Sequence, residues 1–271
     1  TSKGLFFIED INFTAEGDDQ NRILILQSDV LDANVAGVID LNTIVPYFKS
    51  LAMRYAPAIN FETQHYNPQN FNLKVDVKSF QPISALLDPY LSLDDGALLN
   101  AQFSSEDFNA KFTAFSPTVV YKGVKLTNLS VVENADQKAF SLDILADRIN
   151  FADSTYVNNV SIKNTLANDS LVFNLELSER SATNYLNLNG DIHFAHNSPA
   201  YIHFRPSFIV INKDTWALNE EAKMHISQGK VYINDLILSQ DKQRVKLDGI
   251  LSNEADQLHV LFNNFSLASL Q

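Results

Sequence analysis

The 271-residue sequence contains no cysteine, and several other features that it lacks narrow its function further. Without cysteine there is no disulfide, thiolate metal site or cysteine nucleophile, and any redox compartment is compatible with the chain. Only 20 basic residues stand against 32 acidic ones, so the formal charge is −12, and no cluster of lysine and arginine interrupts this balance. A surface that follows phosphates is therefore not expected, and we predict no nucleic acid partner.

The sequence also lacks long apolar runs. None approaches the roughly 20 residues that a helix needs to cross a bilayer. The first ten residues, TSKGLFFIED, have neither the basic region nor the long apolar core of a secretory leader. Because residue 1 is not an initiator methionine, we expect a processed chain or a piece of a longer protein. Hydrophobic residues still make up 45% of the chain, which is enough for a packed core.

Alternation of apolar and polar residues with period two is the commonest local pattern. In FNLKVDVKSF (71–80), Phe71, Leu73, Val75 and Val77 fall on one face of an extended strand and polar residues on the other. Similar segments are RILILQ (22–27), AFSLDILAD (139–147), SLVFNLELS (170–178), YLNLNGDIHF (185–194), KVYINDLIL (230–238), QRVKLDGIL (243–251) and QLHVLFNNF (257–265). They predict a mainly β, antiparallel fold.

Turns and unassigned stretches complete the strand analysis. Asp94-Asp95-Gly96, Asn189-Gly190 and Asp248-Gly249 are typical of hairpin turns or bulges between or within these segments. Residues 1–35 and 95–135 are too irregular for their strand order to be assigned.

Two segments show helical spacing instead. NTIVPYFKSLAMRYAP (42–57) has an amphipathic pattern that ends at proline, and PISALLDPYL (82–91) places a proline in its first turn. Each follows a strand, so that VIDLNTIVPYF (38–48) and VKSFQPISALL (77–87) align, and LFNNFSLASLQ (261–271) begins a third similar unit. We therefore expect one continuous segment over 1–271, with repeat units that start near 38, 77 and 261.

A cluster of histidines is the one place where a metal site is conceivable. Asp191, His193, His196 and His203 lie within a short stretch, and zinc accepts such ligands. Their spacing matches no strong ligand signature, and polar positions on two adjacent strands explain them better. We predict that the chain holds no metal.

Three acidic pairs are the remaining candidates for catalysis. Asp18-Asp19, Asp94-Asp95 and Glu220-Glu221 could supply the two carboxylates of a glycoside hydrolase, but each lies in turn-like sequence, where acidic residues are usually solvated. The sequence has no nucleophile elbow, phosphate loop or dinucleotide fingerprint. We predict that the protein is not an enzyme and uses no cofactor, with an acid hydrolase as the lesser alternative.

The apolar face of the strands has two interpretations, because a sealed core and a groove for a lipid chain place identical demands on the sequence. The groove hypothesis selects inward positions from several strands. Its candidate lining residues are Phe71, Leu73, Val75, Val77, Leu142, Ile144, Phe173, Leu175, Val231, Ile233, Val260 and Phe262. The alternative is a closed β-sandwich, adhesin-like or another protein-interaction module, with an ordinary core.

The C-terminal stretch favours the groove. WALNEEAKMHISQGKVYINDLILSQDKQRVKLDGILSNEADQLHVLFNNFSLASL (216–270) contains a tryptophan, strands with an apolar-polar repeat, a polar turn, a strand that closes on glycine and a final strand. These features occupy Trp216, Lys230–Leu238, Gln240–Gln243, Leu247-Asp248-Gly249 and Asn264-Phe265-Ser266-Leu267. The pattern resembles the AsmA-like family, in particular its TamB (translocation and assembly module) type as found in Bacteroidetes. The segment VIDLNTIVPYFKSL (38–51) is similar to the strand-to-helix unit of the same family.

This resemblance implies an elongated antiparallel sheet folded into an open apolar groove, a β-taco-like arrangement, with two short amphipathic helices. It implies a periplasmic protein of the Gram-negative cell envelope that is anchored in the inner membrane by parts outside this segment. The implied partners are phospholipid or another acyl-chain lipid and outer-membrane assembly proteins. The implied function is lipid passage between the inner and outer membranes in outer-membrane biogenesis. The anchor and C-terminal β-domain of a full-length member are not in the sequence, so we expect an internal segment.

Overall fold

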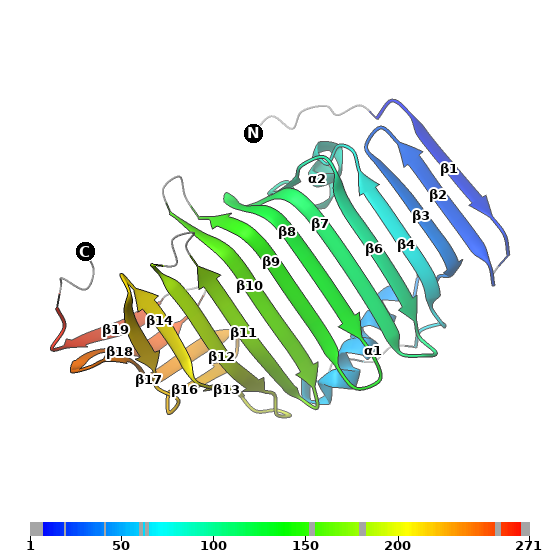
Figure 1. The fold of residues 1–271 in the computed structure, drawn as a ribbon. Coiled ribbons are helices and arrows are strands. Elements are labelled where there is room, and N and C mark those ends of the chain that lie inside the picture. The colour runs from blue at the N-terminus through cyan, green and yellow to red at the C-terminus, as the bar shows by residue number, and fades with distance from the viewer. Residues whose placement is uncertain are drawn as a thin grey trace. The chain divides into compact units, whose positions relative to one another are not determined.

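A computed structural model describes residues 8–18, 20–40, 42–59, 62, 65–151, 155–178, 183–252 and 256–266. Within them the chain is mainly β and its strands pair antiparallel, as the alternation predicts (Figure 1). The helical elements are α1 (Ile44–Tyr55), α2 (Gln81–Leu87) and a 3-10 turn (Pro57–Ile59). The strands are β1 (Ile11–Glu16), β2 (Arg22–Ser28), β3 (Leu31–Val38), β4 (Asn70–Val77), β5 (Leu91–Leu93), β6 (Ala97–Ser104), β7 (Asn109–Tyr121), β8 (Val124–Ala135), β9 (Phe140–Asn150), β10 (Tyr156–Ala167), β11 (Ser170–Ser178), β12 (Tyr185–His193), β13 (Ala200–Phe204), β14 (Ser207–Ile211), β15 (Asp214–Leu218), β16 (Lys223–Ser227), β17 (Lys230–Gln240), β18 (Gln243–Leu251) and β19 (Gln257–Asn263).

The chain divides into two compact units. Unit 1 comprises Thr1–Leu51 and Glu62–Val160, and unit 2 comprises Ala52–Phe61 and Ser161–Gln271. In unit 1 the strands pair in the order β1–β2–β3–β4–β6–β7–β8–β9, and β5 pairs with the end of β7. Figure 1 shows the long strands of this sheet lying side by side. The predicted repeat units are not tested by this division, and the part of the third one at 267–271 lies outside the described residues.

Two strand-to-helix units occur where the sequence predicts them, β3 followed by α1 and β4 followed by α2. The prediction of a helix over 82–91 is wrong at its end, because α2 stops at Leu87. Asp88 has an extended backbone, with φ −151° and ψ 112°. A residue that precedes proline is disfavoured in the helical region, and Pro89 follows here. Leu91 therefore starts β5, which pairs with Val119–Tyr121 of β7.

The predicted strand over 71–80 is confirmed as β4 except for its last three residues. The backbone N–H groups of Lys78 and Ser79 both donate to the carbonyl oxygen of Val30, at 2.9 Å each. Phe80 then precedes the first turn of α2. Among the predicted turns, Asp94-Asp95-Gly96 joins β5 to β6, whereas Asn189-Gly190 and Asp248-Gly249 lie inside β12 and β18.

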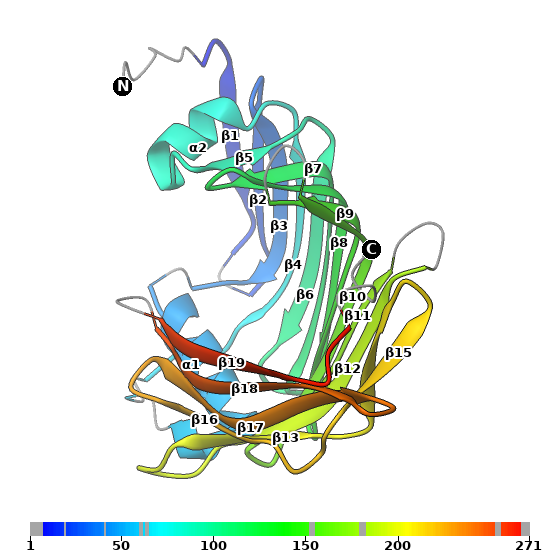
Figure 2. The same cartoon turned by 90° about the vertical axis from the view of Figure 1, so that its left-hand side faces the viewer.

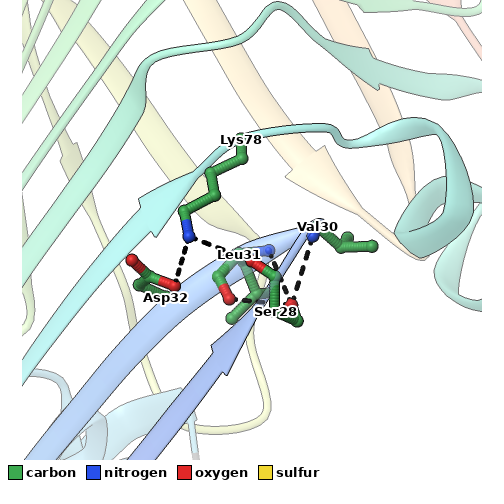
Figure 3. Close-up of polar contacts among 5 residues, drawn as sticks. All are labelled: Ser28, Val30, Leu31, Asp32 and Lys78. Carbon is green, nitrogen blue, oxygen red and sulfur yellow. Dashed lines mark hydrogen bonds and ion pairs between the residues drawn. The ribbon is translucent and has the colours of Figure 1, made fainter. Parts of the chain in front are cut away.

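Polar contacts tie the turn between β2 and β3 to the end of β4 (Figure 3). The Ser28 hydroxyl accepts the N–H groups of Val30 and Leu31, at 3.2 and 3.0 Å, and donates to the Leu31 carbonyl. The Lys78 ammonium donates to Asp32 Oδ1 at 2.6 Å and to the Ser28 carbonyl at 3.0 Å. The hydrogen bond from Lys78 lowers the pKa of Asp32 below its ordinary value. These contacts hold β4 in place where the chain leaves it for α2.

Unit 2 has a branched strand order. One end of β12 pairs with β13 and the other with β14. The branch through β13 continues to β16 and the branch through β14 to β15, and both reach β17, which β18 and β19 follow.

Ile202, Phe204 and Ala222 form a buried cluster against which Phe173 packs. Gly190 lies opposite Phe173, and a Cβ at this glycine would lie 2.6 Å from the Phe173 ring. The absence of a side chain therefore makes room for the ring.

Candidate functional site

Three rows of side chains cross one face of the unit 1 sheet. Directly opposed residues of antiparallel strands share a face, and alternate residues along a strand return to it. The first row is Val35, Leu73, Ala101, Phe112, Glu133 and Leu142. The second is Phe71, Phe103, Ala110, Ala135 and Phe140, and the third is Ala33, Val75, Leu99, Ala114, Val131 and Ile144.

Two adjoining pockets lie on this face. The larger, of about 600 Å³, is lined by members of the three rows together with residues of α1 and of the segment before it. The smaller, of about 290 Å³, lies toward α2 and includes Phe80 and Ile83. Leu99 and Val131 of the third row line both pockets. All the described lining residues are apolar except Ser116 in the smaller pocket and Glu133 in the larger.

Both helices contribute to the lining of these pockets. Figure 2 shows α1 and α2 on the same side of the unit 1 sheet, near opposite ends of its strands. Ile44, Phe48 and Leu51 of α1 line the larger pocket, and the ring of Phe48 meets that of Phe103 edge-on at 5.1 Å between centroids. The helical spacing of these three residues is what directs them to one side of α1.

A buried glutamine anchors the start of α1. Gln69 is 0% exposed, its Oε1 accepts the N–H of Asp40 at 3.0 Å, and its amide donates to Asp40 O and Thr43 Oγ1 at 3.3 Å each. Asn67 donates to Asp40 Oδ2 at 2.6 Å, which lowers the pKa of Asp40 below its ordinary value. The loop that leads into α1 is therefore held against the strand that begins at Asn70.

We expect Gln69→Ala to lower the free energy of unfolding by about 2 kcal/mol, because it leaves the Asp40 N–H without its partner and opens a cavity. Urea unfolding measures this change. The matched control is Gln102→Ala, because Gln102 is exposed on the face of β6 opposite to the one that lines the pockets. Equal losses in the two variants would show that the Gln69 contacts do not anchor α1.

Glu133 is the only ionisable side chain among the described residues that line the two pockets. It is 8% exposed, and its Oε1 has no hydrogen-bond partner. Burial raises its pKa to about 7. Sequence reasoning missed this residue, because Val131 and Val132 are both apolar and obscure which face of β8 is turned inward. The one available signal was that Glu133 shares the parity of Leu129, Val131 and Ala135.

Five of the six unit 1 candidates for the lipid groove line the pockets. Phe71, Leu73 and Leu142 belong to the larger pocket, and Val75 and Val77 to the smaller. The sixth, Ile144, lies opposite Val131 in the third row but is not part of either lining. The structure therefore brings all six to one face of the sheet.

The six candidates of unit 2 lie in more varied surroundings. Phe173 packs on the buried cluster of this unit, Leu175 lies opposite Leu188, and Val231 opposite Ile226 and Leu251. Ile233 is 3% exposed, whereas Val260 and Phe262 of β19 are 49% and 58% exposed. None of the six lines either of the two apolar pockets of unit 1.

Three of the four residues considered for metal binding, Asp191, His193 and His203, have other partners. Asp191 accepts from Arg205 and lies 3.6 Å from His203 Nδ1, and His193 Nδ1 lies 3.1 Å from Ser170 Oγ. In the described part of the chain no group of three or more histidine, aspartate and glutamate side chains could hold a metal ion.

Of the acidic pair Asp18-Asp19, the carboxylate of Asp18 accepts the N–H groups of two residues of its own turn, and Asp19 lies outside the described residues.

No helix in the described ranges is long and apolar enough to span a membrane. Comparisons of the chain with protein-family models, curated proteins and solved structures find no match.

Proposed function

We propose that the apolar face of unit 1 is a lipid groove that holds acyl chains. The observation that carries this proposal is the pair of adjoining pockets, which share Leu99 and Val131 and contain one ionisable group among their described lining residues. The single linear strand order of unit 1 also favours an open face over a closed sandwich, since a sandwich needs two packed sheets. A long, narrow and apolar ligand fits these features best.

The free energy of burying apolar groups favours an acyl chain as the ligand. Each methylene group removed from water contributes about 0.8 kcal/mol, so a chain that spans both pockets gains several kcal/mol without any specific polar contact. The described lining of the pockets has no lysine or arginine to hold a phosphate. We therefore propose that the chain enters the groove while a charged headgroup stays in water. Passage along such a groove requires no nucleophile, metal or nucleotide.

The resemblance of 216–270 and 38–51 to the AsmA-like family supplies the proposed setting. We propose a segment of a TamB- or AsmA-like periplasmic protein, anchored in the inner membrane by other parts, that passes phospholipid or another acyl-chain lipid between the inner and outer membranes. Outer-membrane assembly proteins are the proposed protein partners. The alternative is a protein-interaction module in which the same apolar rows form an ordinary core.

Native mass spectrometry of the 271-residue chain, expressed in a Gram-negative host, tests this proposal. We expect phospholipid to co-purify at a defined stoichiometry and lipid extraction to identify it. A lipid-free sample should take up a fluorescent fatty acid in a saturable manner. A ligand-free mass together with no uptake of the fatty acid would contradict the lipid groove and support the interaction module.

A further inference from the structure

Glu133 has apolar neighbours in every direction on its face of the sheet. Phe112 and Leu142 lie directly opposite it on β7 and β9, and Val131 and Ala135 flank it along β8. The larger pocket is also lined from β3, α1, β4 and β6, and none of the described lining residues on these elements is ionisable. The carboxyl group is thus inside the pocket without a charged partner.

A carboxyl group in this position has an unmet capacity for hydrogen bonds. Oε1 is buried without a partner, and leaving such an acceptor unpaired costs about 1–3 kcal/mol. A plain hydrocarbon chain in the pocket cannot offset this cost, because it has no donor. A ligand that places a hydrogen-bond donor beside Glu133 offsets it.

The position of Glu133 within the rows determines where the ligand must carry this donor. Phe71, Phe103 and Phe140 of the second row lie on one side of it, and Leu99 and Val131 of the third row on the other. Apolar surface therefore extends in both directions along the strands, so the donor must lie within an apolar body. To reach this place an ammonium group would have to leave water, which costs several kcal/mol. The cost of removing a hydroxyl group from water is much smaller.

We propose that the larger pocket selects acyl chains that carry a hydroxyl group along their length, and that the Glu133 carboxylate accepts the hydrogen bond of this hydroxyl. This inference rests on the proposed function, because it requires an acyl chain in the pocket. It adds a preference that an entirely apolar groove would not have.

Displacement of a fluorescent fatty acid from the 271-residue chain at pH 8 tests the preference. The competitors are stearate, a set of hydroxystearate isomers that differ in the carbon bearing the hydroxyl, and the corresponding oxostearates. We expect at least one hydroxystearate to bind about tenfold more tightly than stearate. The matching oxostearate should bind more weakly than stearate, because its carbonyl brings a second acceptor beside an ionised carboxylate.

The pH dependence gives an independent readout. Burial raises the pKa of Glu133 to about 7, so at pH 5.5 the carboxyl is protonated and can donate a hydrogen bond. The oxostearate should therefore gain affinity relative to stearate as the pH falls from 8 to 5.5. No such gain is expected in Glu133→Leu, which should also lose the preference for hydroxystearate over stearate.

The outcomes separate this inference from the proposed function. Failure of stearate and of every hydroxystearate to displace the probe contradicts both. Stearate binding with no preference for any hydroxystearate overturns the role of Glu133 and leaves the lipid groove standing. A preference that survives in Glu133→Leu also overturns the inference, because another group must then select the hydroxyl.

Discussion

Replacement of Glu133 by glutamine should raise the free energy of unfolding by about 3 kcal/mol at pH 8.5 and leave it almost unchanged at pH 4. Glutamine has nearly the same shape as glutamate and carries no charge. At pH 8.5 the native protein holds an ionised carboxylate among apolar side chains of β7, β8 and β9. The amide removes the cost of burying this charge.

The size and sign of this change in the free energy of unfolding follow from the pKa of Glu133. Burial raises it from the ordinary 4.5 to about 7 in the folded protein, and 1.36 kcal/mol per pKa unit gives about 3 kcal/mol. Between these two values the folded protein binds the proton and the unfolded chain does not. The contribution of Glu133 to stability is therefore lost as the pH rises from about 4.5 through about 7. Well above pH 7 the Glu133 carboxyl is ionised in both the folded and the unfolded chain. The difference in unfolding free energy between the native chain and Glu133→Gln then stays constant.

Urea unfolding of the native chain and of Glu133→Gln between pH 4 and pH 8.5 measures this difference. The matched control is Glu106→Gln at an exposed turn, which should change the unfolding free energy by less than about 0.5 kcal/mol. If the native chain and Glu133→Gln differ by the same amount at every pH, the carboxyl of Glu133 is not buried as a charge.

Replacement of Val75 by aspartate should weaken fatty-acid binding at least 100-fold while the chain stays folded. Val75 lines the smaller pocket and lies directly opposite Leu99, which lines both pockets. An ionised carboxylate that an acyl chain covers loses its water at a cost of several kcal/mol, and 1.4 kcal/mol corresponds to a factor of ten. In the proposed groove the charge would stay hydrated while no ligand is bound, so we expect some loss of stability but a folded chain.

Two variants control for this effect. Val75→Thr keeps the shape of the side chain and adds only a neutral hydroxyl, so its affinity should fall far less. Lys74→Asp introduces the same carboxylate on the opposite face of β4, where Lys74 is exposed, and should bind the probe as the native chain does. Fluorescence titration gives the affinities, and circular dichroism checks the fold. Unfolding of Val75→Asp would support an ordinary core, and equal affinities of Val75→Asp and Lys74→Asp would exclude a groove at Val75.

The local elements of this chain could be predicted where a single residue pattern specifies them. The alternation over 71–77 predicts β4, and the apolar spacing of 44–55 predicts α1. The end of α2 was predicted wrongly because Pro89 was included in the helix, although its effect on Asp88 is local and could have been anticipated. The strands β7 and β8 were not assigned, because consecutive apolar residues such as Val119-Val120 and Val131-Val132 break the alternation.

By itself, the sequence determined that the protein is mainly β with two short helices, that cysteine chemistry is absent and that phosphate-binding basic clusters are absent. Only the tertiary structure decided which strands align and in what register, since that depends on pairs of residues far apart in the chain. Register places Phe112, Glu133 and Leu142 in one row with Leu73, more than 30 residues away from each of them. In the sequence Glu133 resembles any other polar residue of a strand. It is the one ionisable group among the described residues that line the two apolar pockets because β7 and β9 bring apolar side chains to both of its sides.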